Sequence, residues 1–313
     1  MAENEQIHVV LGANGGLGNA VVRVLSRHGK KVRAVTRSGN ADVPESTELA
    51  KADTTDKESL MQACAGASVV YHCVNVPYPE WHAQLTGMMQ NILDAAIACG
   101  AKLVYGDNLY MYGYIDGPIR EDAPHAASDA KGILRARLAN MVLSAHREGK
   151  LQATIGRAPD FFGPHVFNAA MGERVFKPAL QSKTINLIGN IDAIHSYSFV
   201  EDFALGLMIL AENERALGEA WHIPSAETMT TRSFLELVFE ATGRRSTIRV
   251  APKILLAAMG LINPMMRELK EMLYQWDYDY VVDHSKFLKT FTFQPTPHAH
   301  AIRQTVEWFK NNT

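Results

Sequence analysis

The stretch Ile7-His-Val-Val-Leu-Gly12-Ala-Asn-Gly15-Gly-Leu-Gly18 decides the fold of this chain. A short apolar run ends at Gly12, glycines recur at Gly15 and Gly18, and residues 19–26 are apolar at helical spacing. A strand, a glycine turn and a helix in this order direct free backbone N–H groups and the positive end of the helix at one point, which suits a pyrophosphate. Gly12 is expected to permit the tight turn, Gly15 the close approach of the phosphates, and Gly18 the close packing of helix on strand.

A second predicted strand, residues 31–36, is followed by Arg37. An acidic residue at this place binds the ribose 2′-hydroxyl of NAD, whereas an arginine accommodates the 2′-phosphate of NADP. Arg37 therefore predicts NADP(H), with NAD as the alternative cofactor and a solvated loop arginine as the alternative role. Asp53, at the end of a third predicted strand, either faces the adenine or caps the helix that begins near residue 56.

Strands and helices continue to alternate along the chain. This alternation implies right-handed crossovers and an α/β fold with a doubly wound parallel sheet, the Rossmann arrangement. Further strands are predicted at 68–74, 101–105 and 151–157, and helices at 81–99, 130–149, 169–180, 199–212, 234–243 and 252–274. We expect a dinucleotide-binding domain over 1–165, with a returning segment near 196–224. A smaller, mainly helical substrate-binding cap is expected over 166–313.

Composition narrows the choice of partners. The chain has 313 residues, a net charge of −2 and 47% hydrophobic residues, which gives no electrostatic reason to expect nucleic acid or an anionic membrane. The polar N-terminus predicts no signal peptide, and the longest apolar stretch, 254–266, is too short to span a bilayer. Three cysteines without metal spacing predict no metal site and a reduced, cytoplasmic protein.

Several segments resemble one known family. The glycine spacing, Asp53, Val104–Gly113, Arg157–Pro164 and Ser198–Asp202 resemble the extended short-chain dehydrogenases/reductases, the NAD-dependent epimerase/dehydratase group. The resemblance covers nearly the whole chain and implies this fold, a nicotinamide cofactor and a small-molecule substrate. It also implies a homodimer through the helices 81–99 and 130–149. The apolar residues expected at that surface are Leu85, Met88, Met89 and Ile92.

The expected catalytic residues depart from the family pattern. The family carries a Ser or Thr and then Tyr-x-x-x-Lys, but no tyrosine of this chain has a lysine four residues later. Asn108 stands in the Ser position, Lys131 in the Tyr position and Arg135 in the Lys position. Asn108 can donate to a carbonyl oxygen. Arg135 can donate to ribose hydroxyls, and its charge would tune Lys131 towards neutrality as an acid or base.

Two alternatives stay open for these positions. Lys131 and Arg135 can instead be solvated charges on an amphipathic helix. Tyr110 is a further candidate proton donor, whereas the resemblance gives Tyr112 a structural role.

The remaining candidate residues line the predicted ligands. Those expected to bind the cofactor are Gly12, Asn14, Gly15, Gly16, Leu17, Gly18, Arg37, Asp53, Thr54, Cys73, Asn75, Arg135 and Ala158. Those expected to contact the substrate are Tyr78, Trp81, Phe161, His195 and Tyr197.

Three function classes fit these observations. The main prediction is an NADPH-dependent reductase of a small or medium carbonyl-type substrate with a non-standard active site. A sugar-nucleotide epimerase or dehydratase is the alternative, although its first step normally needs the tyrosine that is absent here. A non-catalytic NADP(H)-binding sensor is the third possibility.

Overall fold

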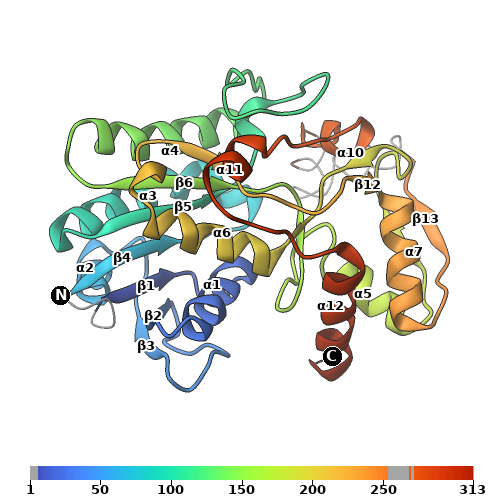
Figure 1. The fold of residues 1–313 in the computed structure, drawn as a ribbon, viewed down its shortest axis with the longest axis horizontal. Coiled ribbons are helices and arrows are strands. Elements are labelled where there is room, and N and C mark those ends of the chain that lie inside the picture. The colour runs from blue at the N-terminus through green and yellow to red at the C-terminus, as the bar shows by residue number, and fades with distance from the viewer. Residues whose placement is uncertain (1–5, 253–267, 269–270, 313) are drawn as a thin grey trace.

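Seven parallel strands form the central sheet of the protein (Figure 1). The computed structural model describes residues 6–252, 268 and 271–312. The strand order is β11-β6-β5-β4-β1-β2-β3. The strands are β1 (Ile7–Leu11), β2 (Lys31–Thr36), β3 (Glu48–Lys51), β4 (Ala67–His72), β5 (Lys102–Asp107), β6 (Ala153–Arg157) and β11 (Ala220–His222). The order reverses between β1 and β4, and ligands of such sheets bind at the carboxyl ends of the strands beside this reversal.

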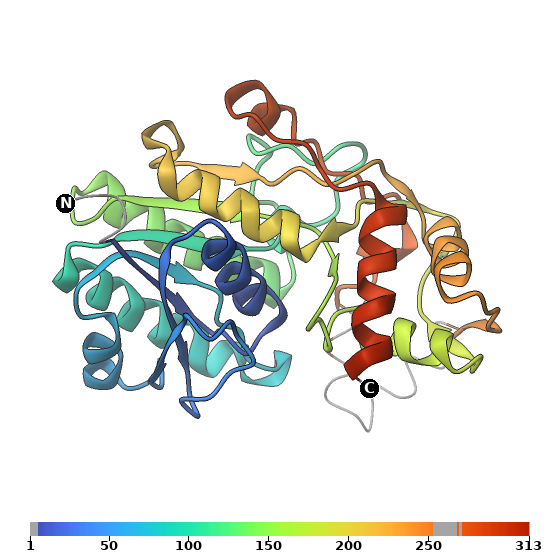
Figure 2. The same ribbon diagram turned by 60° about the horizontal axis from the view of Figure 1, so that its bottom comes forward.

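Helices cover both faces of the sheet, which is why its central strands are continuous apolar runs (Figure 2). One face packs on α2 (Lys57–Cys64), α3 (Trp81–Cys99) and α4 (Ala130–Arg147). The other packs on α1 (Gly16–Arg27) and α6 (Val200–Glu212).

The second part of the chain forms a smaller, mainly helical unit beside the sheet, on the right of Figure 1. Its apolar core joins three helices that are far apart in the sequence, α5 (Glu173–Leu180), α7 (Thr231–Thr242) and α12 (His298–Asn312). Three short strand pairs surround them: β7 (Phe161–Phe162) with β10 (Ser198–Phe199), β8 (Ile185–Leu187) with β13 (Ile248–Val250), and β9 (Ile194–His195) with β12 (Met229–Thr230). The short helix α10 (Tyr274–Asp277) follows in this unit, which we call the cap. The next helix, α11 (Ser285–Thr290), returns to the sheet, where its Phe287 packs in the same apolar cluster as Trp221 of β11.

The predicted fold class is confirmed, and several element boundaries shift. β5 extends to Asp107, so two further residues belong to the strand. The helix α2 is capped by Asp56, whose side chain accepts from the backbone N–H groups of Glu58 and Ser59. Asp53 therefore is not that cap. Most of the predicted helix 252–274 lies outside the described residues, and the domain boundary at 165/166 stays a prediction.

The apolar face predicted for a dimer is not a surface. Leu85, Met88, Met89 and Ile92 are all buried in the core between the sheet, α2, α3 and α4. Their helical spacing reflects packing within one molecule, so the prediction that they offer interface area is wrong. The large apolar side chains that α3 and α4 expose are Ile97 and Ile133.

Candidate active site

The glycine turn between β1 and α1 is open at the helix N-terminus. Gly12 has a φ of 84°, and a Cβ there would lie 2.9 Å from the Cys73 carbonyl oxygen. A Cβ at Gly18 would overlap the Gly12 carbonyl. At Gly15, however, a Cβ would meet only one atom, the Gly12 oxygen at 3.4 Å. Because no side chain of a described residue caps α1, its first N–H groups can bind an anion, so the turn fits a pyrophosphate.

An apolar layer supports the turn from behind. Leu17 and Ala158 belong to one apolar cluster, against which Cys73 packs. Gly16 lies against Val166, whose Cγ2 would be 2.9 Å from a Cβ at this glycine. These residues hold the turn in place, and any contact they make with a cofactor stays a prediction.

The loop after β2 folds back onto the turn. Asn14 donates through Nδ2 to the Asn40 carbonyl at 2.9 Å. Arg37 is exposed, and it lies near enough to Asp53 to help lower the pKa of that carboxyl, after two larger contributions from hydrogen bonds to Thr55. Thr54 is buried, and its carbonyl accepts a hydrogen bond from Asn91. One cation and one carboxylate therefore lie together where the adenosine of a dinucleotide is expected.

Arg135 lies at the carboxyl ends of β4 and β5, with 5% of the residue exposed. It donates to the Tyr105 hydroxyl at 2.7 Å and to Asn75 Oδ1 at 3.2 Å, and lies 3.4 Å from Asp107 Oδ1. Its guanidinium carbon is 4.2 Å from the centre of the Trp81 ring. Arg135 Nε is buried without a hydrogen-bond partner among the described residues, which leaves a donor for a ligand.

Lys131 is also buried, with 1% of the residue exposed. Its ammonium pairs with Glu268 and, at 3.0 Å, with Glu271. Burial acts to lower the pKa of Lys131, but the hydrogen bonds and charges of the two glutamates outweigh burial and raise it. The prediction of a lysine tuned towards neutrality is therefore wrong. The alternative of two solvated helix charges is wrong as well, for both Lys131 and Arg135.

Two tyrosine hydroxyls meet beside these cations. The hydroxyls of Tyr78 and Tyr110 are 2.8 Å apart, and Tyr78 packs edge-on against Trp81. Burial raises the pKa of both phenols, that of Tyr110 well above its usual range. Both therefore stay protonated at neutral pH and can donate a hydrogen bond. Asn108 accepts the backbone N–H of Tyr110 at its Oδ1, so its amide nitrogen remains the group that can donate.

The predicted substrate residues fall into two groups. Tyr78, Trp81 and His195 lie towards the sheet edge described above. Tyr197 is fully buried in the cap core, where its hydroxyl meets Thr231 at 2.7 Å, and Phe161 packs against Phe203 of α6. Tyr197 and Phe161 thus have packing roles in this structure.

Sequence reasoning missed Asp160, which lies near His195 and several of these tyrosines. It also missed Glu268 and Glu271. Asp160 had a usable signal, because it lies three residues after the carboxyl end of β6. The glutamates come from a distant segment and had no such signal.

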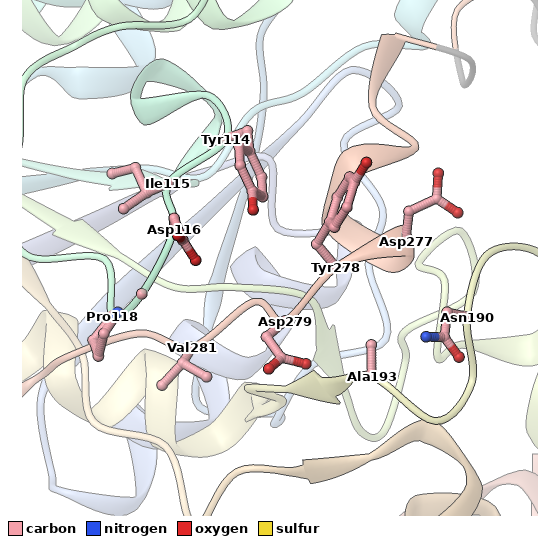
Figure 3. Close-up of a pocket in the computed structure, with 11 residues that line it drawn as sticks. Tyr114, Ile115, Asp116, Pro118, Asn190, Ala193, Asp277, Tyr278, Asp279 and Val281 are labelled. Atoms are coloured by element: carbon pink, nitrogen blue, oxygen red, sulfur yellow. The ribbon is translucent and has the colours of Figure 1, made fainter.

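A cleft of about 530 Å³ lies on the cap side of the site (Figure 3). It opens between residues 114–118 and 277–281, and two of its lining side chains, Tyr114 and Tyr278, pack against each other with ring centres 4.8 Å apart. Three carboxylates line it, those of Asp116, Asp277 and Asp279. The adjoining Tyr280 is buried and pairs with His195, so the cleft lies next to the site. Its acidic lining disfavours a phosphorylated ligand.

Among the residues that the structure describes, no group of three or more His, Cys, Asp or Glu side chains could hold a metal ion. Within the same part, no helix is long and apolar enough to cross a membrane.

The open glycine turn and the polar cluster around Arg135 lie at the same edge of a parallel sheet. Together they form an α/β site of the kind at which parallel sheets bind dinucleotides. A model of the NAD dependent epimerase/dehydratase family matches residues 8–223, and the chain belongs to this family. The predicted resemblance is confirmed.

Curated relatives are distant. A dTDP-glucose 4,6-dehydratase of Streptomyces antibioticus is 24% identical over an alignment of 232 residues, and the match covers 71% of this chain and 62% of that protein. A 3beta-hydroxysteroid-dehydrogenase/decarboxylase isoform 2 of Arabidopsis thaliana is 22% identical over an alignment of 303 residues, and the match covers 83% of this chain and 52% of that protein. The chain thus matches only about half to three fifths of the length of these relatives.

Solved structures share the fold. The dTDP-glucose 4,6-dehydratase DesIV of Streptomyces venezuelae, with NAD and TYD bound, is 19% identical with a TM-score of 0.79 and 98% coverage of both chains. The UDP-glucose 4-epimerase of Thermus thermophilus, in complex with NAD, is 18% identical with a TM-score of 0.79, covering 98% of this chain and 100% of that one.

Proposed function

We propose that the protein is an NAD(P)-dependent oxidoreductase that transfers a hydride at a carbon bearing a hydroxyl or carbonyl oxygen. The observation that carries this proposal is the pairing of an uncapped α1 N-terminus with the buried Arg135 cluster at one sheet edge. The first suits a pyrophosphate, and the second offers a buried donor to the sugar and nicotinamide end of a dinucleotide. When bound, the nicotinamide supplies or accepts the hydride.

NADP(H) is the proposed cofactor, with NAD(H) as the alternative. Exposed Arg37 supports NADP(H), because its guanidinium can make charge-assisted hydrogen bonds to a 2′-phosphate. The solved relatives that contain NAD, and the family itself, support NAD(H). Asp53 beside Arg37 can accept from a ribose hydroxyl and fits either cofactor.

The comparisons support a sugar nucleotide as substrate more than a simple carbonyl compound. Several relatives are named as sugar-nucleotide dehydratases or epimerases, so we propose this substrate class first.

Two observations favour the second candidate, a carbonyl reductase. The raised pKa of Tyr78 and of Tyr110 keeps both phenols protonated. They suit proton donation to a carbonyl oxygen better than removal of a hydroxyl proton. The acidic cleft beside the site also disfavours a diphosphate.

One assay separates these candidates. The protein is incubated with sugar nucleotides and NAD⁺ or NADP⁺, and separately with carbonyl compounds and NADPH, while absorbance and product mass are followed. An epimerase or dehydratase regenerates its cofactor, so product appears without net change in absorbance. A reductase consumes one NADPH per product. Cofactor binding without any turnover supports a non-catalytic NADP(H)-binding sensor, and failure to bind either cofactor refutes the proposal.

A further inference from the structure

Asp160 and His195 meet at the boundary between sheet and cap. Asp160 lies between β6 and β7, at the carboxyl edge of the sheet, and His195 ends β9 of the cap. His195 Nε2 is 3.4 Å from Asp160 Oδ2. The Asp160 side chain is 13% exposed and that of His195 is 3% exposed. The two residues therefore form a nearly enclosed pair at the edge where substrate and cofactor are expected.

Both nitrogens of the His195 ring face oxygen atoms that carry lone pairs. Nδ1 is 3.2 Å from the Gln275 carbonyl oxygen, which can only accept a hydrogen bond, so Nδ1 carries a proton. In a neutral ring, Nε2 would then present its own lone pair to the Asp160 carboxylate. Nε2 is buried and makes no hydrogen bond to any described residue. A second proton on the pair removes this repulsion and gives Nε2 a hydrogen to donate.

The carboxylate of Asp160 is held in place from the other side. Trp276 donates through Nε1 to Asp160 Oδ2 at 2.8 Å, which holds the carboxylate in place beside the imidazole. The His195 ring is held between Tyr197 and Tyr280, with ring centres 4.5 and 5.2 Å away. Both partners thus have fixed orientations.

The other titratable groups around the pair do not change protonation near neutral pH. The phenols within electrostatic reach of Asp160 are Tyr78, Tyr110, Tyr197 and Tyr280, and burial raises the pKa of each. Lys131 and Arg135, which act on Tyr78 as well, stay charged. Imidazole is the side chain that gains and loses a proton between about pH 5 and pH 8.

We propose that Asp160 and His195 together hold one transferable proton and that the pair exchanges it with the substrate oxygen through Asp160, its more exposed member, in place of the tyrosine that this chain lacks. This inference rests on the proposed function. In the reducing direction, hydride leaves the dihydronicotinamide for the carbonyl carbon, the proton moves from Nε2 to the Asp160 carboxylate, and the O–H bond of Asp160 breaks as the new O–H bond of the alcohol forms. The products are the alcohol, the oxidised cofactor, a neutral His195 and an ionised Asp160. In the oxidising direction, each of these transfers runs in reverse.

The first test needs neither cofactor nor substrate. Long-range ¹H–¹⁵N spectra of the protein report the protonation of each histidine ring, and the His195 signals are those lost in His195→Phe. We expect both ring nitrogens to be protonated at pH 7 in the wild type and Nδ1 alone in Asp160→Asn. Asparagine keeps the side-chain volume and an acceptor for Trp276. A singly protonated ring in both proteins overturns the proposal.

A matched control uses another buried histidine. His298 is stacked in the cap core and contacts the Glu227 carbonyl through Nε2, away from Asp160. His298→Phe should leave the His195 signals unchanged. If His298→Phe alters them as Asp160→Asn does, the effect is a general change in the cap and the proposal fails.

The second test is kinetic and uses both single turnovers with the cofactor and steady-state rates. We expect Asp160→Asn and His195→Phe to slow hydride transfer about a hundredfold or more with cofactor affinity unchanged. Because the carboxylate stabilises the charged imidazole, the fall in reduction rate at high pH should move to lower pH in Asp160→Asn. A raised KM with unchanged kcat would assign the pair to substrate positioning and overturn the acid–base role. If no substrate reacts, the proposed function fails, while the spectra still decide whether the pair holds the proton.

Discussion

Two alanine substitutions in the glycine turn should separate folding from cofactor binding. Gly15 lies at the helix N-cap with a φ of −78°, which any residue adopts, and a Cβ there would make only an ordinary contact with the Gly12 oxygen. Gly12 has a φ of 84°, and its Cβ would lie 2.9–3.0 Å from backbone atoms of Cys73 and Val74. The same methyl group is therefore tolerated by the fold at one position and rejected at the other.

The expected magnitudes follow from this geometry. At Gly12, the left-handed backbone costs about 1–2 kcal/mol for an alanine, and displacing backbone neighbours adds about 1–3 kcal/mol. Gly12→Ala should thus lower the free energy of unfolding by about 2–5 kcal/mol. Gly15→Ala should change it by less than about 1 kcal/mol. It places a methyl group over the uncapped helix N-terminus, however, and should weaken cofactor binding at least tenfold, or about 1.4 kcal/mol.

Chemical denaturation measures the first quantity, and titration of NADPH fluorescence measures the second. Wild type and both variants are compared at the same ionic strength, because phosphate binding is screened by salt. Gly15→Ala with wild-type affinity would refute the placement of the pyrophosphate at this turn. Gly12→Ala with wild-type stability would contradict the assigned backbone conformation.

Four further predictions address the remaining residues. Arg37→Ala should abolish a preference for NADPH over NADH in binding titrations, and equal affinities in the wild type would refute the assignment. Lys131→Met leaves two glutamates without their cation and should cost about 1–3 kcal/mol in chemical denaturation, less than a fully buried pair because the carboxylates are partly exposed. Since the folded-state pKa of Lys131 is raised, this contribution to stability should be complete at neutral pH and disappear only as pH rises through that raised value. Measurements of the free energy of unfolding from neutral to alkaline pH test this, and a loss of the contribution already near neutral pH would contradict it. Asn108→Ala should lower kcat about a hundredfold. Asn108→Asp keeps the oxygen that accepts from the Tyr110 backbone N–H but loses the amide donor, so it should be equally slow. A fully active Asn108→Asp variant would exclude the donor role of Asn108. We expect a homodimer by light scattering and a monomer for Ile133→Asp, because Ile133 is 55% exposed on α4; a monomeric wild type refutes this.

Local sequence patterns predicted the fold well. The glycine spacing and the alternation of apolar segments depend on neighbouring residues, so the turn after β1 and the parallel sheet were accessible without a structure. The same patterns could not distinguish core from interface, and the apolar face of α3 was assigned to a dimer although it packs within the molecule.

Much of the candidate site depends on contacts between distant segments. The charge state of Lys131 is set by Glu268 and Glu271, and spacing along α4 contains no information about them. The pairing of Asp160 with His195 likewise requires the β9 segment to return to the sheet edge. The helix spacing correctly placed Arg135 and Lys131 on one face, but their electrostatic surroundings come from the tertiary fold.

The composition of the cap core determines the order in which a newly made chain can mature. Phe162 and Phe176 of this core are synthesised early, whereas α12 supplies Ala301, Ile302 and Phe309 at the other end of the chain. Translation must therefore pass residue 309 before the cap can close, while the strands up to β6 are available for pairing much earlier. During that interval the aromatic residues of the cap remain uncovered, which makes the nascent chain most prone to aggregation late in its synthesis.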